Sequence, residues 1–102
     1  VDFNPTVGRE QAGRRPALVV SDNALNSGPR GLVVMIPVTG TPRGLPTHFP
    51  ISPPEGGLTK PSVIMTEQVR SASKDRLGRR YGVVAQATMD QVDRILRIVL
   101  NL

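Results

Sequence analysis

The chain has 102 residues, a length that fits one domain (residues 1–102) and leaves no room for two. Thirteen Lys and Arg residues outnumber eight Asp and Glu residues, giving a net charge of +5, and eleven of the thirteen are Arg. This surplus favours a polyanionic partner, most simply nucleic acid, over ordinary surface charge, which stays the alternative. With no Cys and one His, the sequence excludes disulfides, thiolate metal sites and a two-histidine ribonuclease mechanism. No apolar run approaches the ~18 residues of a membrane span, so we expect a cytoplasmic protein. Separately, we expect no metal or other cofactor.

Ten Pro and ten Gly cut the chain into short segments, a rhythm typical of a small β-barrel. We interpret residues 1–3 as the end of a strand and residues 4–14 as a polar loop. Apolar runs predict further strands at residues 16–21, 31–38, 47–51, 62–66 and 81–85. Pro37 near the end of the second run indicates an edge strand or a bulge. The expected fold is mainly β.

One helix is predicted, over residues 88–100, because apolar residues recur there with a 3.6-residue period: Met89, Val92, Ile95, Leu96 and Val99. Thr88 and Gln91 fit a capping box at its start. Three further apolar residues lie off this stripe, and we favour a helix end tucked under the barrel over contact with a partner: Ile98, Leu100 and Leu102. Ser73 is expected to cap a helical turn within residues 73–80.

Two positions at strand ends could carry chemistry. Arg15 closes a glycine-bracketed loop rich in Arg and precedes Pro16, which favours an extended backbone there. Thr39 follows the second apolar run, where its hydroxyl could be held against a phosphate, although such a Thr more often bonds its own backbone. The loop itself is as compatible with a solvated hairpin as with a binding site.

The segment 66–70 is predicted to be extended, with Glu67 and Val69 on one face and Gln68 and Arg70 on the other. Such a strand could present Gln and Arg to RNA, or could be an amphipathic edge strand with solvated polar groups. His48 has no obvious carboxylate partner, so we expect a surface or half-buried residue rather than a catalyst.

The stretch VDFNPTVGREQAGRRPALVVS resembles the MazF/PemK family of bacterial toxin endoribonucleases. The family signature is Asp-x-x-Pro, then Gly-x-Glu-Gln-x-Gly, then Arg-Pro before an apolar strand, and all three elements occur here in order. Two later stretches, IPVT at 36–39 and IMTEQVRS at 64–71, match the family's second and third motifs. Gly40 follows Thr39 at a position where members often have Thr or Ser.

The resemblance implies an SH3-like barrel with a C-terminal helix, working as a homodimer. It also implies metal-independent, sequence-specific cleavage of single-stranded RNA, leaving 2′,3′-cyclic phosphate and 5′-hydroxyl ends and inhibiting translation and growth. A cognate antitoxin with an acidic C-terminal tail is the expected protein partner.

Carried over by position, the catalytic pair is Arg15 and Thr39, and Glu10 is a weaker candidate, as general base. Residues implied to contact RNA are Arg9, Gln11, Arg14, Gln68 and Arg70. The loops at 41–45 and 56–60 are expected to influence which RNA sequence is cut.

Two other functions are compatible with such a chain. A gyrase-binding toxin of the same fold would act through its C-terminal helix and would not need the polar loop around Arg15. A basic RNA-binding barrel without catalysis would bind RNA and leave it intact. Assays of gyrase supercoiling and of RNA cleavage discriminate among the three.

Overall fold

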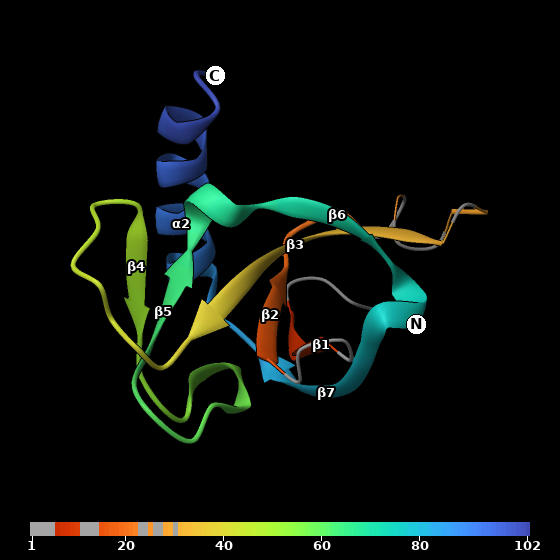
Figure 1. The fold of residues 1–102 in the computed structure, drawn as a ribbon, viewed down its shortest axis with the longest axis horizontal. Coiled ribbons are helices and arrows are strands. Elements are labelled where there is room, and N and C mark those ends of the chain that lie inside the picture. Colours follow the sequence, from red (N-terminus) through yellow and green to blue (C-terminus); the bar gives the residue numbers. More distant parts are fainter. Residues whose placement is uncertain (1–5, 11–14, 23–24, 26–27, 30) are drawn as a thin grey trace.

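A computed structural model describes residues 6–10, 15–22, 25, 28–29 and 31–102, which form a curled antiparallel sheet with one long C-terminal helix (Figure 1). The described strands are β1 (Thr6–Glu10), β2 (Arg15–Val19), β3 (Leu32–Thr39), β4 (His48–Ile51), β5 (Ser62–Met65), β6 (Arg70–Ser73) and β7 (Leu77–Val83). The helix is α2 (Gln86–Val99), and short 3₁₀ turns are η1 (Glu55–Gly57), η2 (Thr66–Gln68) and η3 (Lys74–Arg76). The expectation of a mainly β fold with a C-terminal helix is confirmed.

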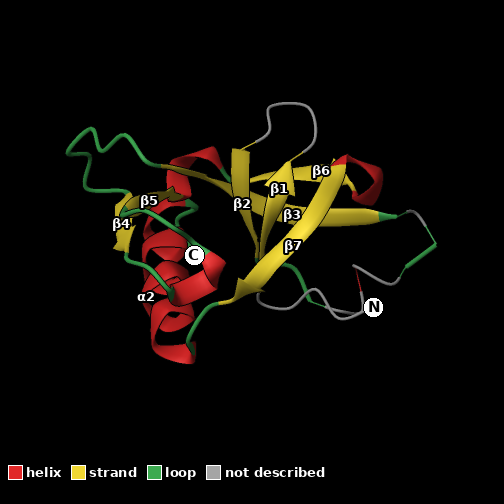
Figure 2. Ribbon diagram, turned by 90° about the horizontal axis from the view of Figure 1, so that it is seen from below, coloured by secondary structure: helices red, strands yellow, loops and turns green. Residues whose placement is uncertain are grey.

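Strand order in the sheet is β4-β5-β3-β2-β1-β7, with β6 also pairing with β3. One edge of β3 pairs with β2, and the other edge pairs first with β6 and then, at its end, with β5. Figure 2 shows α2 on the side of the sheet that carries β4 and β5, with the end of β7 leading into it through a short loop. No helix in the described ranges is long and apolar enough to cross a membrane.

Pro37 lies inside β3, a central strand, and not at an edge or bulge as the sequence indicated. It pairs with Ala17 of β2. On the opposite edge, the β6 pairing ends at Met35 and the β5 pairing begins at Val38. Because Pro37 falls between these two partners, its missing N–H leaves no ladder hydrogen bond unmade.

Both faces of the central strands are buried. On one face of β2 and β3 the core contains Ala17, Val19, Val33, Met35 and Ala72. The larger core lies on the other face, where α2 contributes two residues of the predicted apolar stripe, Met89 and Val92. Its other buried members are Leu18, Ile36, Val38, Ile51, Leu58, Ile64 and Val84. Burial on both faces explains why β2 and β3 appear in the sequence as continuous apolar runs instead of alternating patterns.

Several predicted elements differ from the structure. The segment 4–14 was expected to be a loop, but residues 6–10 form β1, which is held by backbone pairing to β2 and β7. The segment 66–70 is not one extended strand, because η2 turns the chain from β5 to β6 along the same edge of β3. Strand β7 begins at Leu77, four residues before the predicted start. The predicted strand end at residues 1–3 lies outside the described residues.

The two ends of the helix also differ from expectation. Ile98 and Leu102 are 75% and 87% exposed, so the helix end is not tucked under the barrel. At the start, α2 begins at Gln86 after Ala85, whose side chain cannot cap it, and no Thr88–Gln91 capping box forms. Ser73, in contrast, caps η3 as predicted, accepting a hydrogen bond from the Asp75 N–H.

Glu55 of η1 replaces the missing cap. Its Oε2 accepts hydrogen bonds from the Ala85 N–H at 2.9 Å and from the Thr88 hydroxyl. A carboxylate here also faces the positive end of the helix dipole. The start of α2 is therefore held by a residue some thirty positions earlier in the chain.

Replacing Glu55 by Ala is expected to lower the free energy of unfolding by about 1–2 kcal/mol, the usual cost of losing a helix cap. Glu55→Gln should cost less, because an amide oxygen still accepts one bond but carries no charge. Urea denaturation checks both, with Asp93→Asn on the exposed side of α2 as a matched carboxylate control. Equal stability of Glu55→Ala and the control would contradict this account.

Candidate active site

A cleft of about 690 Å³ opens where four segments meet. These are the start of β2, the end of β3 with the loop after it, the segment between η1 and β5, and β7. The cleft is lined by Arg15, Pro16, Val38, Thr39, Gly40, Thr41, Arg43, Gly57, Leu58, Thr59, Lys60, Ser62 and Tyr81. Polar and cationic groups thus surround a small apolar floor.

Arg15 and Thr39 lie at neighbouring strand tips in this cleft. The β2–β3 register pairs Ala17 with Pro37. This is the last pair of the ladder at this end, so Arg15 and Thr39 each lie two residues beyond it, at the tips of adjacent strands. Both residues line the cleft, so the sheet brings together the two residues carried over as a catalytic pair.

The Thr39 hydroxyl has a defined orientation. Its Oγ1 accepts a hydrogen bond from the Thr41 N–H at 3.2 Å, the local backbone bond expected of a Thr at a strand end. Because the oxygen accepts in this bond, its own hydrogen stays available for donation. The backbone role and a ligand-binding role are therefore compatible: the first orients the donor that the second needs.

Three cations face this cleft, from β2, from the loop after β3 and from the segment before β5: Arg15, Arg43 and Lys60. None of the described lining residues is acidic. Within the described part of the chain, no carboxylate lies in ion-pair contact with any of the three. Such a cluster attracts an anion and can hold a phosphate without displacing an internal partner.

The wall opposite Thr39 depends on close backbone contact between η1 and β7. Gly57 has φ +71°, and a Cβ built there would lie 2.2 Å from the Tyr81 carbonyl oxygen. Gly82 also lies close to the backbone of η1, since a Cβ added to it would be 3.0 Å from the Gly57 nitrogen. Only glycine at position 57 lets the turn approach β7 closely enough to form this side of the cleft.

The structure places the other predicted site residues unevenly. The backbones of Arg9 and Glu10 are in β1, across from Pro16 and Arg15 respectively. Gln11 and Arg14 lie outside the described residues.

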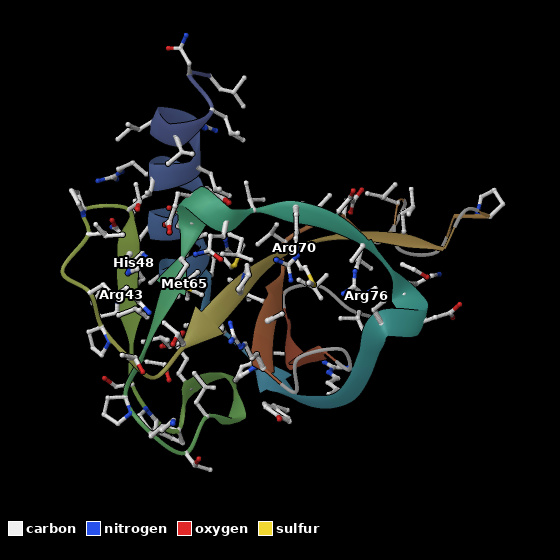
Figure 3. All side chains as sticks on the ribbon, in the orientation of Figure 1. Arg43, His48, Met65, Arg70 and Arg76 are labelled. Carbon is white, nitrogen blue, oxygen red and sulfur yellow. The ribbon has the colours of Figure 1, made fainter. Side chains whose placement is uncertain are left out.

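Gln68 and Arg70 are exposed but do not line the cleft. They come from η2 and β6, and in Figure 3 Arg70 lies over the β3–β6 pair, well away from the loop that carries Arg43. The structure therefore separates these two from Arg15 and Thr39.

A second polar cluster lies on β4 and η2. The His48 Nε2 is 3.1 Å from Glu67 Oε2, and the Thr47 hydroxyl donates to Glu67 Oε1 at 2.8 Å. The His48 side chain is 4% exposed, so the expectation that it lacks a carboxylate partner is wrong. The partner was missed because the two residues are 19 positions apart and meet only through the turn of η2. No described residue bonds the other ring nitrogen, Nδ1, which is buried.

The environment of Glu67 lowers the pKa of its carboxyl below the ordinary value of 4.5. Desolvation alone would raise this pKa, but hydrogen bonds from Thr47, from its own backbone and from His48, with the charge on His48, outweigh it. Since the folded-state pKa is depressed, the resulting stabilisation is present above 4.5 and is lost as the pH falls through the lower folded value.

Glu67→Gln is therefore expected to destabilise the protein at neutral pH and to converge with the wild type as the pH is lowered past the Glu67 pKa. Thr47→Val, which removes one donor, should weaken the same dependence without abolishing it. Urea denaturation across the acid range measures both. If the free energy of unfolding changed with pH in the same way in wild type and Glu67→Gln, the ionised Glu67 carboxylate would not stabilise the folded state.

Fold and cleft together define a small, basic, mainly β protein with a composite cationic cleft. In the described ranges, no group of three or more His, Asp or Glu side chains is close enough to hold a metal ion. The chain belongs to the PemK-like, MazF-like toxins of type II toxin-antitoxin systems, whose family profile matches residues 1–100.

Similar proteins cover almost the whole chain. Endoribonuclease EndoA of Bacillus subtilis (strain 168) is 37% identical over 102 residues, 99% of this chain and 88% of the relative. Endoribonuclease MazF of Staphylococcus epidermidis is 32% identical over 102 residues, which are 99% of this chain and 85% of the relative. A solved structure of an endoribonuclease in complex with its cognate antitoxin, from mycobacterial species, superposes with a TM-score of 0.85 at 31% identity, covering 100% of this chain and 97% of that one.

Proposed function

We propose that this chain is the toxin of a type II toxin–antitoxin pair and an endoribonuclease that cuts single-stranded RNA at specific sequences in the cytoplasm. Cleavage of messenger RNA, and of ribosomal or transfer RNA where the sequence occurs, would stop translation and growth. The observation that carries the proposal is the cleft that Arg15 and Thr39 both line, together with two further cations that have no carboxylate partner in the described part of the chain. The endoribonuclease relatives support it.

The chemistry that suits this cleft is internal transesterification of RNA. The 2′-oxygen attacks the adjacent phosphorus and the bond to the 5′-oxygen breaks, so that a 2′,3′-cyclic phosphate and a 5′-hydroxyl are formed. Arg15 donates a pair of charged N–H groups to the developing negative charge, and the Thr39 hydroxyl donates a third bond. These groups need no water molecule or metal ion as a reactant.

Two proton transfers complete the reaction. One proton must leave the 2′-hydroxyl and one must reach the departing 5′-oxygen. A guanidinium is a poor base, since its pKa lies above ~12. We assign the first transfer to Glu10, whose backbone lies directly across from Arg15 in the β1–β2 ladder.

The remaining partners are supported by the family to which the chain belongs, by its net charge and by the exposed apolar residues near the end of α2. Arg9, Gln11, Arg14, Gln68 and Arg70 would contact RNA outside the reacting phosphate. A net charge of +5 would attract an acidic antitoxin tail. Working as a homodimer would cover apolar surface, and the exposed apolar residues at the end of α2 are available for either protein partner: Ile98, Leu100 and Leu102.

The decisive experiment incubates the purified protein with a pool of single-stranded RNA in EDTA and sequences the new ends. Discrete cuts that leave 5′-hydroxyl and 2′,3′-cyclic phosphate ends at a common sequence are expected, with no effect on gyrase supercoiling. Intact RNA together with inhibited gyrase would replace the proposal by the gyrase-binding function. Cleavage that needs a divalent ion would contradict the chemistry.

A further inference from the structure

Lys60 crosses the surface of Gly40 at the mouth of the cleft. A Cβ built on Gly40 would lie 2.5 Å from Cε, 2.9 Å from Nζ and 3.2 Å from Cδ of Lys60. The lysine stem thus occupies the space that any side chain at position 40 would fill. Its ammonium is set beside the residue that follows Thr39.

The position of Lys60 is fixed by the strand that follows it. The hydroxyl of Ser62, which is 5% exposed, donates to the Lys60 carbonyl oxygen at 3.0 Å. Pro61 restricts the Lys60 backbone to extended conformations. Strand β5 then pairs with the end of β3, Val63 opposite Thr39. These contacts hold the base of the lysine stem next to the tip of β3.

The ammonium is exposed, and no described carboxylate is within ion-pair distance of it. It is a compact charge with three donors on a flexible stem, whereas Arg15 presents a rigid fork. The two cations therefore suit different tasks on one strand of nucleic acid. The fork fits the reacting phosphate, and the mobile point charge can follow an oxygen of the same or an adjacent phosphate.

We propose that Lys60 is a phosphate-binding residue of this cleft, and that Gly40 lets its ammonium take this position because the bare backbone leaves room for the lysine stem. The inference rests on the proposed function in taking RNA as the ligand. It gives a physical reason for a glycine directly after Thr39, because the lysine stem and ammonium fill the space that a side chain there would need. Gly40→Ala should then act by displacing Lys60.

The test uses four variants of the full chain: Lys60→Met, Lys60→Arg, Gly40→Ala and the Gly40→Ala/Lys60→Met double variant. Binding is measured against salt with a single-stranded oligonucleotide carrying 2′-O-methyl riboses, which cannot undergo attack by the 2′-oxygen. Loss of one phosphate contact should reduce the slope of log affinity against log salt by about 0.7. Cleavage of unmodified RNA should fall roughly tenfold in Lys60→Met.

Lys60→Arg, which keeps a cation, should retain most of the binding and the salt slope. Gly40→Ala should weaken binding on its own and have little additional effect once Lys60 is Met. An unchanged salt slope in Lys60→Met, or effects of the two substitutions that simply add, would overturn the inference. Urea denaturation of each variant separates these results from unfolding.

The outcome for the proposed function is read separately. If the wild type binds the oligonucleotide with a slope that Lys60→Met reduces, but cuts no RNA, cleavage is refuted and the Lys60 contact stands. If the wild type cuts RNA and Lys60→Met changes neither slope nor rate, cleavage stands and the Lys60 contact is refuted. Failure of the wild type to bind any oligonucleotide refutes both.

Discussion

Arg15→Ala is expected to slow RNA cleavage by about 10²–10³-fold, the range seen when one donor to a developing oxyanion is removed. Arg15 is exposed at the tip of β2 and has no ion-pair partner in the described part of the chain. The loss should therefore be in the rate and not in the stability of the fold. Single-turnover cleavage of a short RNA containing the recognised sequence measures it.

Three further variants sharpen this prediction. Arg15→Lys keeps the charge but loses the bidentate fork, so an intermediate rate is expected. Thr39→Ser keeps both the hydroxyl donor and the acceptor for Thr41, whereas Thr39→Val removes both. We expect near-normal cleavage by Thr39→Ser and a large loss of cleavage by Thr39→Val. If Arg15→Ala cleaved as fast as the wild type, the reacting phosphate would have to lie elsewhere on the protein.

Gly57→Ala is expected to have the largest effect on stability, at least about 3 kcal/mol. Two costs combine. The residue has φ +71°, and the added methyl would meet the Tyr81 carbonyl oxygen at 2.2 Å. Since that atom belongs to the backbone of β7, it cannot turn aside as a side chain could. Urea denaturation measures the loss.

Gly44→Ala is the natural control for this substitution. Gly44 has φ +68°, nearly the same as Gly57, but a Cβ added at this position would have no atom within 4 Å. The free energy of unfolding of Gly44→Ala should therefore fall only by the cost of a left-handed backbone at a non-glycine residue, about 1–2 kcal/mol. The difference between the two variants then isolates the collision with β7. Equal losses would mean that η1 is not held against β7 in solution.

The strands that could be predicted well from the sequence are those whose side chains form the hydrophobic core. Continuous apolar runs indicated β2, β3 and β5, because both faces of these strands are buried. The stretch TVGRE lacks such a pattern and becomes β1 only because β2 and β7 pair with its backbone on both sides. Long-range pairing of this kind leaves no local signal in side-chain periodicity.

The turn at η2 shows a second reason why the structure could not be predicted fully from the sequence. Residues 66–70 have the alternation of a strand, yet the chain must leave β5 and return along the same edge of β3 as β6. That geometry requires a turn whatever the local preference. The bend also places Glu67 against Thr47 and His48, so one missed turn concealed a charge cluster as well.

For the candidate site, the positions of Arg15 and Thr39 came from family motifs, and the sheet register explains why they meet. The sequence indicated the loops at 41–45 and 56–60 only as influences on specificity. That Lys60 lies over Gly40 depends on β5 pairing with the end of β3 after the intervening residues 40–61, which include β4 and η1. The residue types were visible, but their distance in space was not.

The turn η1 connects two parts of the molecule that are usually considered separately. At one end, Glu55 holds the start of α2. At the other, Gly57 rests on the backbone of Tyr81 and forms a wall of the cleft. A ligand that displaced the first turn of α2 would therefore also shift the cleft wall, because Glu55 and Gly57 belong to the same three-residue turn. Coupling between the start of α2 and the cleft therefore needs no domain motion.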